Sequence, residues 1–250
     1  MAIISYSGKN YHGWQIQKNA LTIQEVFQNA LWKILPEKPE IKGCSRTDTG
    51  VHANMYAVNF KVNSDISCKN LVLALNSRLP RDIALNFCNE VPMSFHARYS
   101  CVKKEYIYKI WNQKTRNPFL DGYIYHHYYP LNLEILRDTA KEFLGTHDFT
   151  AFCTLDKREK KNMIRTVYNF DIFENNDIIE IKVCADGFLY NMVRIMVGTL
   201  LKAAQGKIFK EDIKDIIASK CRHRAGPTAP AHGLYLNKVY YCEGIIYEKS

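Results

Sequence analysis

The segment Gly43-Cys-Ser-Arg46-Thr-Asp48-Thr-Gly50-Val-His52-Ala53 is a polar loop between two strand-like segments. Loops on rigid scaffolds commonly carry catalytic groups. Asp48 follows Arg46 closely, and a carboxylate that acts as nucleophile or base at neutral pH needs a nearby cation to stabilise its charged form. A simple turn is the alternative interpretation, because Asp hydrogen-bonds its own backbone and Gly accepts positive φ. Both interpretations stay open on these residues alone.

Around this loop, the first hundred residues alternate between strand and helix patterns. Apolar residues recur at helical spacing over residues 22–35, with Thr22 as the expected N-cap. The other predicted elements are strands over 2–6, 55–62 and 83–91 and a helix over 68–79. This order predicts a β-α-β-β-α-β-like unit.

The rest of the chain has a similar mixture of elements. Its predicted strands are 105–111, the pair 167–173 and 178–185 around the turn 174–177, and 234–241. Its predicted helices are 131–144, 189–204 and 211–218, with an exposed loop over 220–233. The sequence therefore predicts an α+β protein of two similar α/β subdomains with mixed or antiparallel sheets. We expect the boundary near Cys101, giving an N-terminal subdomain (1–101) with the Asp48 loop and a C-terminal one (102–250).

Composition narrows the class of protein. The 34 Lys and Arg exceed the 25 Asp and Glu, and the net charge of +9 favours a polyanionic partner, although a solvated lysine-rich surface would give the same value. The eight cysteines are scattered without zinc-site or redox-motif spacing, which predicts reduced thiols and no structural metal. The first residues lack the apolar stretch of a signal peptide, so we expect a soluble, cytoplasmic protein.

Arg194 is a second candidate, because it interrupts an apolar helical segment between Met192 and Gly198. A guanidinium there either extends to solvent or pairs with a carboxylate in a cleft. Asp48 is the partner that we predict.

Several ordered motifs occur along nearly the whole chain. They are Tyr11-His-Gly-Trp14-Gln15 with Gln17, Thr22-Ile-Gln24, Arg46-Thr-Asp48-Thr-Gly50-Val-His52-Ala53, Phe95-His96-Ala97-Arg98, Tyr106-Ile-Tyr108, Gly145-Thr-His147-Asp148-Phe149-Thr150-Ala-Phe152, Arg165-Thr166-Val167, Phe188-Leu-Tyr-Asn191-Met-Val-Arg194-Ile-Met-Val-Gly198 and Pro230-Ala-His-Gly233-Leu234-Tyr-Leu236. Together these motifs resemble the TruA-type tRNA pseudouridine synthases. A lone Arg-Thr-Asp match would be weak, whereas so many ordered motifs make coincidence a poor explanation.

The resemblance implies a pseudouridine-synthase fold with a central basic cleft and isomerisation of uridine in the anticodon stem-loop of tRNA, at positions 38, 39 and 40. It also implies a homodimer that needs neither cofactor nor metal. By resemblance, Asp48, Tyr106 and Arg194 are catalytic, and Arg46, Tyr106 and Leu234 bind the substrate. Asp48 either attacks the sugar or abstracts a sugar proton, and both routes stay open. His52 is expected to form hydrogen bonds within the loop rather than to act as a base.

Further basic residues are candidates for RNA contact, although a solvated surface charge is the simpler interpretation of each one taken alone. These are Lys103, Lys104, Arg158, Lys160, Lys161, Arg222 and Arg224. Two rival functions use the same residues: a non-catalytic RNA-binding protein and a glycosylase that releases the base. A metal-dependent nuclease is disfavoured because no carboxylate cluster accompanies Asp48 in its loop.

Overall fold

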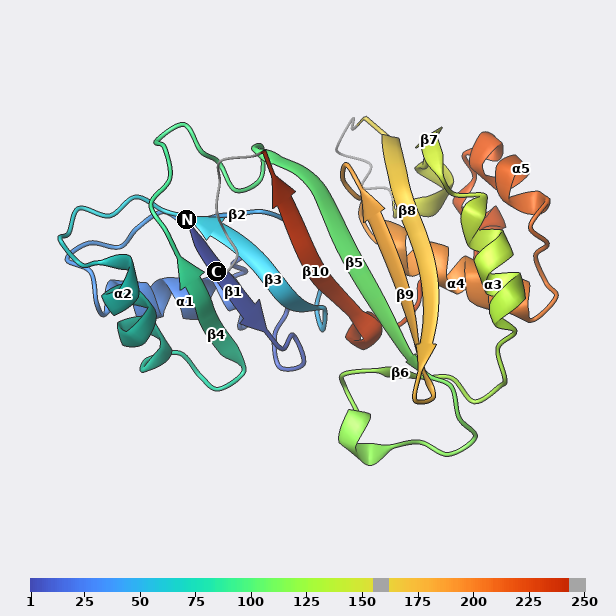
Figure 1. Ribbon diagram of the computed structural model, residues 1–250, viewed down its shortest axis with the longest axis horizontal. Helices are drawn as coiled ribbons and strands as arrows, with labels where there is room; N and C mark the ends of the chain where they lie inside the picture. The colour runs from blue at the N-terminus through green and yellow to red at the C-terminus, as the bar shows by residue number, and fades with distance from the viewer. Residues whose placement is uncertain (155–161, 243–250) are drawn as a thin grey trace. The chain divides into compact units, whose positions relative to one another are not determined.

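A computed structural model describes residues 1–154 and 162–242, and the chain divides into two compact units. The first unit comprises Met1–Val102 together with the described residues from Tyr235, and the second comprises the described residues of Lys103–Leu234. Figure 1 labels the helices and strands of both units. The predicted subdomain division at residue 101 stays a prediction, and the structure adds that the last strand pairs within the first unit.

The first unit contains a mixed sheet in which the strand order is β4-β1-β3-β10. Its strands are β1 (Ala2–Tyr6), β3 (His52–Asn59), β4 (Ile83–Cys88) and β10 (Leu234–Tyr241, whose first residue belongs to the second unit), with the short β2 (Lys42–Gly43) beside β3. β1 runs antiparallel to β3 and to β4. β10 runs parallel to β3 through Tyr235 and Leu236, so the C-terminal strand completes a sheet that begins at residue 2.

Two helices belong to this unit, α1 (Ile23–Trp32) and α2 (Cys68–Asn76). Ile23, Phe27 and Leu31 are fully buried on one stripe of α1, as the helical spacing of the apolar residues predicts. Thr22 is at the N-cap position, but its side chain makes no capping hydrogen bond. α1 ends at Trp32, earlier than the expected residue 35.

The second unit contains a sheet in which the strand order is β5-β9-β8-β7. Its strands are β5 (Cys101–Trp111, whose first residues belong to the first unit), β7 (Gly145–Asp148), β8 (Ile164–Asn175) and β9 (Ile178–Ala185), with β6 (Tyr125–His126) parallel to the end of β5. β8 and β9 form a hairpin whose two turn residues, Asn176 and Asp177, have φ of 49° and 65°. Asn and Asp tolerate positive φ, which explains the tight turn.

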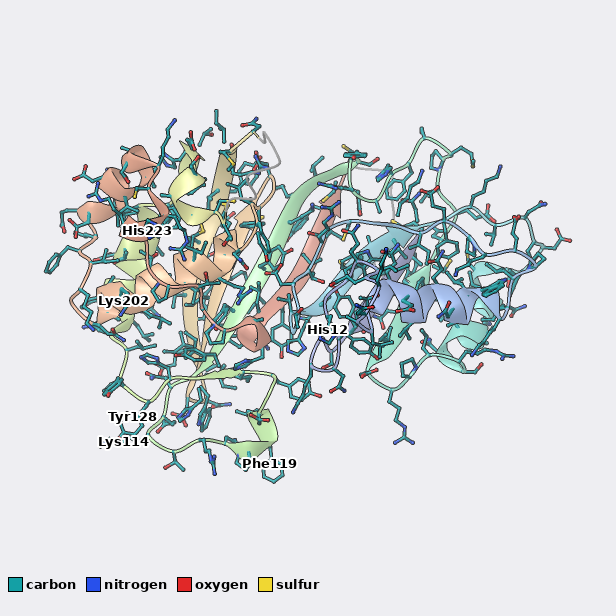
Figure 2. The ribbon with its side chains drawn as sticks, turned by 180° about the vertical axis from the view of Figure 1, so that it is seen from behind. His12, Lys114, Phe119, Tyr128, Lys202 and His223 are labelled. Atoms are coloured by element: carbon teal, nitrogen blue, oxygen red, sulfur yellow. The ribbon has the colours of Figure 1, made fainter. Side chains whose placement is uncertain are left out.

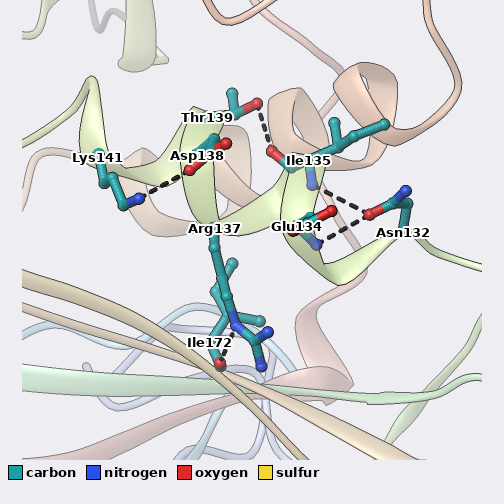
Figure 3. A network of polar contacts seen from close by, with 8 residues as sticks. All are labelled: Asn132, Glu134, Ile135, Arg137, Asp138, Thr139, Lys141 and Ile172. Carbon is teal, nitrogen blue, oxygen red and sulfur yellow. Dashed lines mark hydrogen bonds and ion pairs between the residues drawn. The ribbon is translucent and has the colours of Figure 1, made fainter.

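The helices of the second unit are α3 (Leu133–Lys141), α4 (Met192–Ala204) and α5 (Asp212–Ser219), and short 3-10 turns are η1 (Pro118–Leu120), η2 (Thr150–Phe152), η3 (Arg222–Arg224) and η4 (Ala231–Gly233). Asn132 caps α3 by accepting hydrogen bonds from the backbone N–H groups of Glu134 and Ile135 (Figure 3). Arg137 donates from Nε to the carbonyl of Ile172 at 3.0 Å, which joins α3 to β8.

The segment between β5 and α3 carries large exposed aromatic side chains. Phe119 in η1 is 91% exposed, and Tyr128 and Tyr129 are also exposed. Figure 2 labels Phe119 and Tyr128, whose side chains point away from the ribbon.

The predicted α+β class is confirmed, because helices accompany a mixed sheet in the described residues. The short strands β2, β6 and β7 were not predicted. The expected helix over 131–144 is confined to Leu133–Lys141, and β5 begins at Cys101 rather than at residue 105.

Candidate active site

The Asp48 loop, residues 44–51, connects β2 to β3 and is held through its backbone. The N–H of Trp14 donates to the carbonyl of Thr47 at 3.1 Å, and the N–H of Gly50 donates to the carbonyl of Tyr11 at 3.3 Å. Inside the loop, the N–H of Val51 donates to the carbonyl of Asp48 at 3.1 Å. The loop is therefore held against residues 8–14, the segment that contains the Tyr11-His-Gly-Trp14 motif.

Two glycines allow this close approach. A Cβ on Gly13 would lie 2.3 Å from the carbonyl oxygen of Thr47, and Gly13 has φ of +82°. A Cβ on Gly8 would lie 2.1 Å from the carbonyl oxygen of Val51. No side chain fits at either distance, so both positions that contact the Asp48 loop require glycine.

Aromatic side chains lie beneath the loop. The hydroxyl of Tyr6 on β1 is 2.9 Å from the hydroxyl of the buried Thr47. Tyr56 on β3 donates its hydroxyl to the carbonyl of Ser45 and stacks on Trp14 with ring centroids 4.2 Å apart. These contacts direct Thr47 inward, whereas Arg46 is exposed and Asp48 is half-buried. The backbone that carries the Asp48 side chain is therefore fixed.

His52 is buried rather than exposed in the loop. It is the first residue of β3 and only 1% exposed. Its Nδ1 accepts a hydrogen bond from the N–H of Gly8 at 3.0 Å, and its ring stacks on Tyr235 at 4.6 Å. The bond from Gly8 comes from outside the loop, so His52 joins the loop to the segment before α1, which is a structural role.

Tyr106 lies in the middle of β5, opposite Val183 of β9, and is 6% exposed. Its ring meets that of Phe188 edge to face, with centroids 5.1 Å apart and planes at 86°. This geometry is favourable for aromatic pairs and fixes the orientation of the Tyr106 ring. Phe188 belongs to the motif that also contains Arg194, but the sequence did not single it out.

Arg194 lies in the first turn of α4 and is half-buried. Its Nε donates to the carbonyl of Ala229 at 2.7 Å, and one terminal nitrogen donates to Oδ1 of Asn191 at 2.9 Å. The N–H of Ala229 in turn donates to the carbonyl of Arg194 at 3.0 Å. The guanidinium is therefore positioned by its own unit. Pairing with Asp48, which belongs to the other unit, stays a prediction.

Asn191 makes this arrangement possible. It precedes α4 with φ of 63°, a left-handed conformation that Asn tolerates better than most residues. From there its side chain contacts the guanidinium of Arg194. An Asn immediately before an apolar helix was the available sequence signal for this residue.

Close backbone contacts also fix the segment that Arg194 contacts. A Cβ on Gly198 of α4 would lie 1.7 Å from the carbonyl oxygen of Pro227. The N–H of Gly226 donates to the hydroxyl of Thr199 at 2.9 Å. The segment 226–229 therefore lies directly on α4.

Leu234 is 5% exposed and follows η4 at the start of β10. The preceding Gly233 lies against Tyr108, because a Cβ there would be 2.7 Å from the ring. Tyr108 donates its hydroxyl to the carbonyl of Pro230 at 2.9 Å. Burial raises the pKa of Tyr108, the nearby Tyr125 adds to this rise and Arg194 opposes it. Tyr108 is therefore a neutral, structural tyrosine.

The candidate RNA-contacting residues differ in their surroundings. Lys103 lies over the ring of Tyr168 at 5.6 Å. Arg222 donates to the carbonyl of Gly226 at 2.8 Å and to the hydroxyl of Thr228 at 3.2 Å, and these hydrogen bonds tie its side chain to the loop. Arg224 donates to the carbonyl of Asp215 at 3.3 Å. Arg158, Lys160 and Lys161 lie outside the described residues.

Within residues 1–154 and 162–242, no group of three or more His, Cys, Asp or Glu side chains could hold a metal ion. In the same part of the chain, no helix has the length and apolar character needed to cross a membrane.

Comparison with known proteins agrees with the motifs. A family model described as tRNA pseudouridine synthase matches residues 2–100 and 139–242. The tRNA pseudouridine synthase A of Thermoanaerobacter sp. (strain X514) is 49% identical over 241 residues, covering 96% of this chain and 98% of that protein. The tRNA pseudouridine synthase A of Bacillus subtilis (strain 168) is 42% identical over 240 residues, covering 95% and 97%.

A solved structure gives only a distant likeness. A chain titled "Crystal Structure of a Cbf5-Nop10-Gar1 Complex" is 13% identical with a TM-score of 0.39, covering 81% of this chain and 44% of that chain.

The matched family model and the motif-bearing loop define the class, an RNA-modifying isomerase. The chain belongs to the tRNA pseudouridine synthase family, in the group of tRNA pseudouridine synthase A (TruA). The family and the enzyme class predicted from the motifs are both confirmed.

Proposed function

We propose that this chain converts uridine to pseudouridine in the anticodon stem-loop of tRNA, at positions 38, 39 and 40, with Asp48 as the catalytic carboxylate. The observation that carries the proposal is the Asp48 loop, whose backbone is held on both sides of the half-buried residue Asp48. A preorganised carboxylate is what nucleophilic or basic catalysis at a sugar requires. Similarity to tRNA pseudouridine synthase A over nearly the full length supports the substrate class.

The reaction breaks the bond between N1 of uracil and C1′ of ribose and forms a bond between C5 and C1′. The hydrogen on C5 leaves as a proton, and N1 gains one, so substrate and product are isomers. No electron acceptor or group donor is needed for this balance. Asp48 either attacks the sugar or abstracts a sugar proton, and both routes require the ionised carboxylate.

The proposed role of Arg194 is to stabilise the charge of Asp48 and the charge that develops on the detached base. Its support is a half-buried guanidinium that Asn191 and Ala229 already orient. A preoriented cation loses little freedom when the substrate binds, which is favourable for catalysis.

Tyr106 and Leu234 are proposed to contact the target base. Phe188 orients the Tyr106 ring, whose face could stack on uracil while its hydroxyl assists proton transfer. Leu234 is buried and apolar, and it would help to exclude water while the uracil turns. Arg46 is exposed next to Asp48, where it could hold a phosphate and occupy the space that a flipped base leaves.

We also propose that the enzyme recognises the tRNA mainly by shape and phosphate contacts, because A-form RNA hides its major groove. The proposed place of binding is a basic cleft to which both predicted subdomains contribute. The net charge of +9 supports this mode of binding. A cytoplasmic homodimer without cofactor or metal completes the proposal, on the similarity to tRNA pseudouridine synthase A.

The test is tritium release from tRNA that carries 5-tritiated uridine, without added metal or nucleotide. Wild type should release tritium, and Asp48→Asn should lower turnover at least about a thousandfold while tRNA affinity, measured by filter binding, stays within about twofold. Asp65→Asn is the matched control, because Asp65 is an exposed carboxylate of the same unit.

Other outcomes separate the rival functions. If the wild-type protein bound tRNA but released no tritium, the non-catalytic RNA-binding function would be favoured. Free uracil with an abasic tRNA product would favour the glycosylase. Loss of tRNA binding and folding in Asp48→Asn would assign Asp48 a structural role.

A further inference from the structure

Cys68 and Cys88 bring two thiols together in the first unit. Cys68 is the first residue of α2 and Cys88 is the last residue of β4. Their Sγ atoms are 3.4 Å apart, with the thiol of Cys88 donating to the sulfur of Cys68. Both side chains are partly exposed. The sequence separation of 20 residues concealed the pair, because no short motif connects them.

We propose that Cys68 and Cys88 form a reversible dithiol–disulfide site whose substrate is a low-molecular-weight disulfide. A disulfide needs the two sulfurs at about 2.05 Å, so only a small movement separates the observed pair from the bonded state. This site is independent of the proposed function, because neither cysteine belongs to the Asp48 loop and its test requires no RNA.

The two sulfurs have different roles in this exchange. The thiol of Cys88 donates its hydrogen bond to the sulfur of Cys68, and Cys68 is the first residue of α2. Burial raises the pKa of Cys88 to about 12, and the hydrogen bond to Cys68 contributes. Cys68 is therefore the attacking sulfur, and Cys88 is the resolving sulfur.

The Cys68 thiolate attacks the small disulfide RSSR, which gives a mixed disulfide on Cys68 and releases RS⁻. Cys88 transfers its proton to that RS⁻ and displaces the second RS⁻ from the mixed disulfide, and this second RS⁻ takes up the proton first lost by Cys68. The protein loses two hydrogens and two electrons, and RSSR becomes two RSH. A reducing thiol reverses both steps.

The cross-link would tie the start of α2 to the end of β4. It would close a loop within a unit whose strand β4 already pairs with β1. Cross-links that close loops of this length restrict the unfolded chain, so oxidation should raise the Tm by about 5 °C or more. The pair would thus stabilise the first unit under disulfide stress and keep both sulfurs from irreversible oxidation.

The experiment treats the full-length protein with glutathione disulfide and measures intact mass, non-reducing peptide maps and Tm by calorimetry. We expect the loss of two hydrogens, a peptide that links Cys68 to Cys88, and a raised Tm that dithiothreitol restores to its initial value. Cys68→Ser and Cys88→Ser should each lose the linked peptide and the rise in Tm. Cys221→Ser is the matched control, because Cys221 is also partly exposed, and it should behave as wild type.

Two results would overturn the proposal. One is wild-type protein that gains only glutathione adducts, since this would mean that the thiols react but cannot meet. The other is wild-type protein that stays unmodified, or that links Cys68 or Cys88 only to other cysteines. Because the wild type itself is measured, a variant that folds poorly leaves both outcomes readable.

Discussion

Asp48 and Arg194 are held in opposite ways. The Asp48 loop is fixed mainly through its backbone atoms, since Trp14 and Tyr11 bond to its main chain and Gly13 approaches the carbonyl of Thr47. Arg194 is fixed through its side chain, whose nitrogens donate to Ala229 and Asn191. Removing the Asp48 side chain should therefore leave its loop in place, whereas removing the Arg194 side chain also removes contacts that hold its unit together.

The largest expected effect comes from adding one methyl group next to the Asp48 loop. Gly13→Ala would place Cβ 2.3 Å from the carbonyl oxygen of Thr47 at φ of +82°, so we expect the free energy of unfolding to fall by about 3 kcal/mol. Gly206→Ala is the control, because Gly206 has φ of +68° and no atom near its Cβ, and it should cost about 1 kcal/mol. Urea unfolding measures both. Equal losses would mean that the close approach does not hold the loop.

Arg194→Ala should have the next largest effect on stability. It removes hydrogen bonds of a charged side chain, so we expect a loss of about 2 kcal/mol and a fall in tritium release of at least about a hundredfold. Arg137→Ala removes a comparable bond to the carbonyl of Ile172 and should cost about 1 to 2 kcal/mol with unchanged turnover. If both variants kept full turnover, Arg194 would have only a structural role.

Tyr6→Phe removes one hydroxyl from beneath the Asp48 loop. The buried Thr47 would lose the bond at 2.9 Å, so we expect about 1 kcal/mol less stability and a loss of turnover below about tenfold. A double-mutant cycle with Thr47→Val measures the coupling, which we expect to be about 1 kcal/mol. Additive effects of the two substitutions would show that the hydroxyl pair does not position the loop.

The smallest effect is expected at the buried His127. Among the described residues its buried Nε2 has no hydrogen-bond partner, and burial, with a contribution from His126, lowers its pKa below the ordinary 6.5. The unfolded chain then binds more protons than the folded chain below about pH 6.5, so stability should fall as pH decreases through that range. His127→Phe should flatten this slope in urea unfolding measured at several pH values. If the free energy of unfolding changed with pH equally in wild type and in His127→Phe, His127 would not be the cause of the pH dependence.

Several elements could be predicted because their signals are local. The spacing of Ile23, Phe27 and Leu31 predicted α1, and alternation over 106–110 predicted β5. The short strands β2, β6 and β7 could not be predicted, because strands of two to four residues have no measurable period and depend on distant partners. The helices α1 and α3 end earlier than their apolar patterns, because tertiary packing decides where a helix stops.

The sequence by itself determined the family and the candidate residues, because the motifs around Asp48, Tyr106 and Arg194 can be recognised from residue types and their order along the chain. Only the tertiary structure decided how these residues are supported. The pairing of Tyr6 with Thr47, the approach of Gly13 to the Asp48 loop and the meeting of Cys68 with Cys88 join residues 20 or more positions apart. No periodicity or spacing in the sequence predicts such contacts, because only the folding of the chain brings their atoms together.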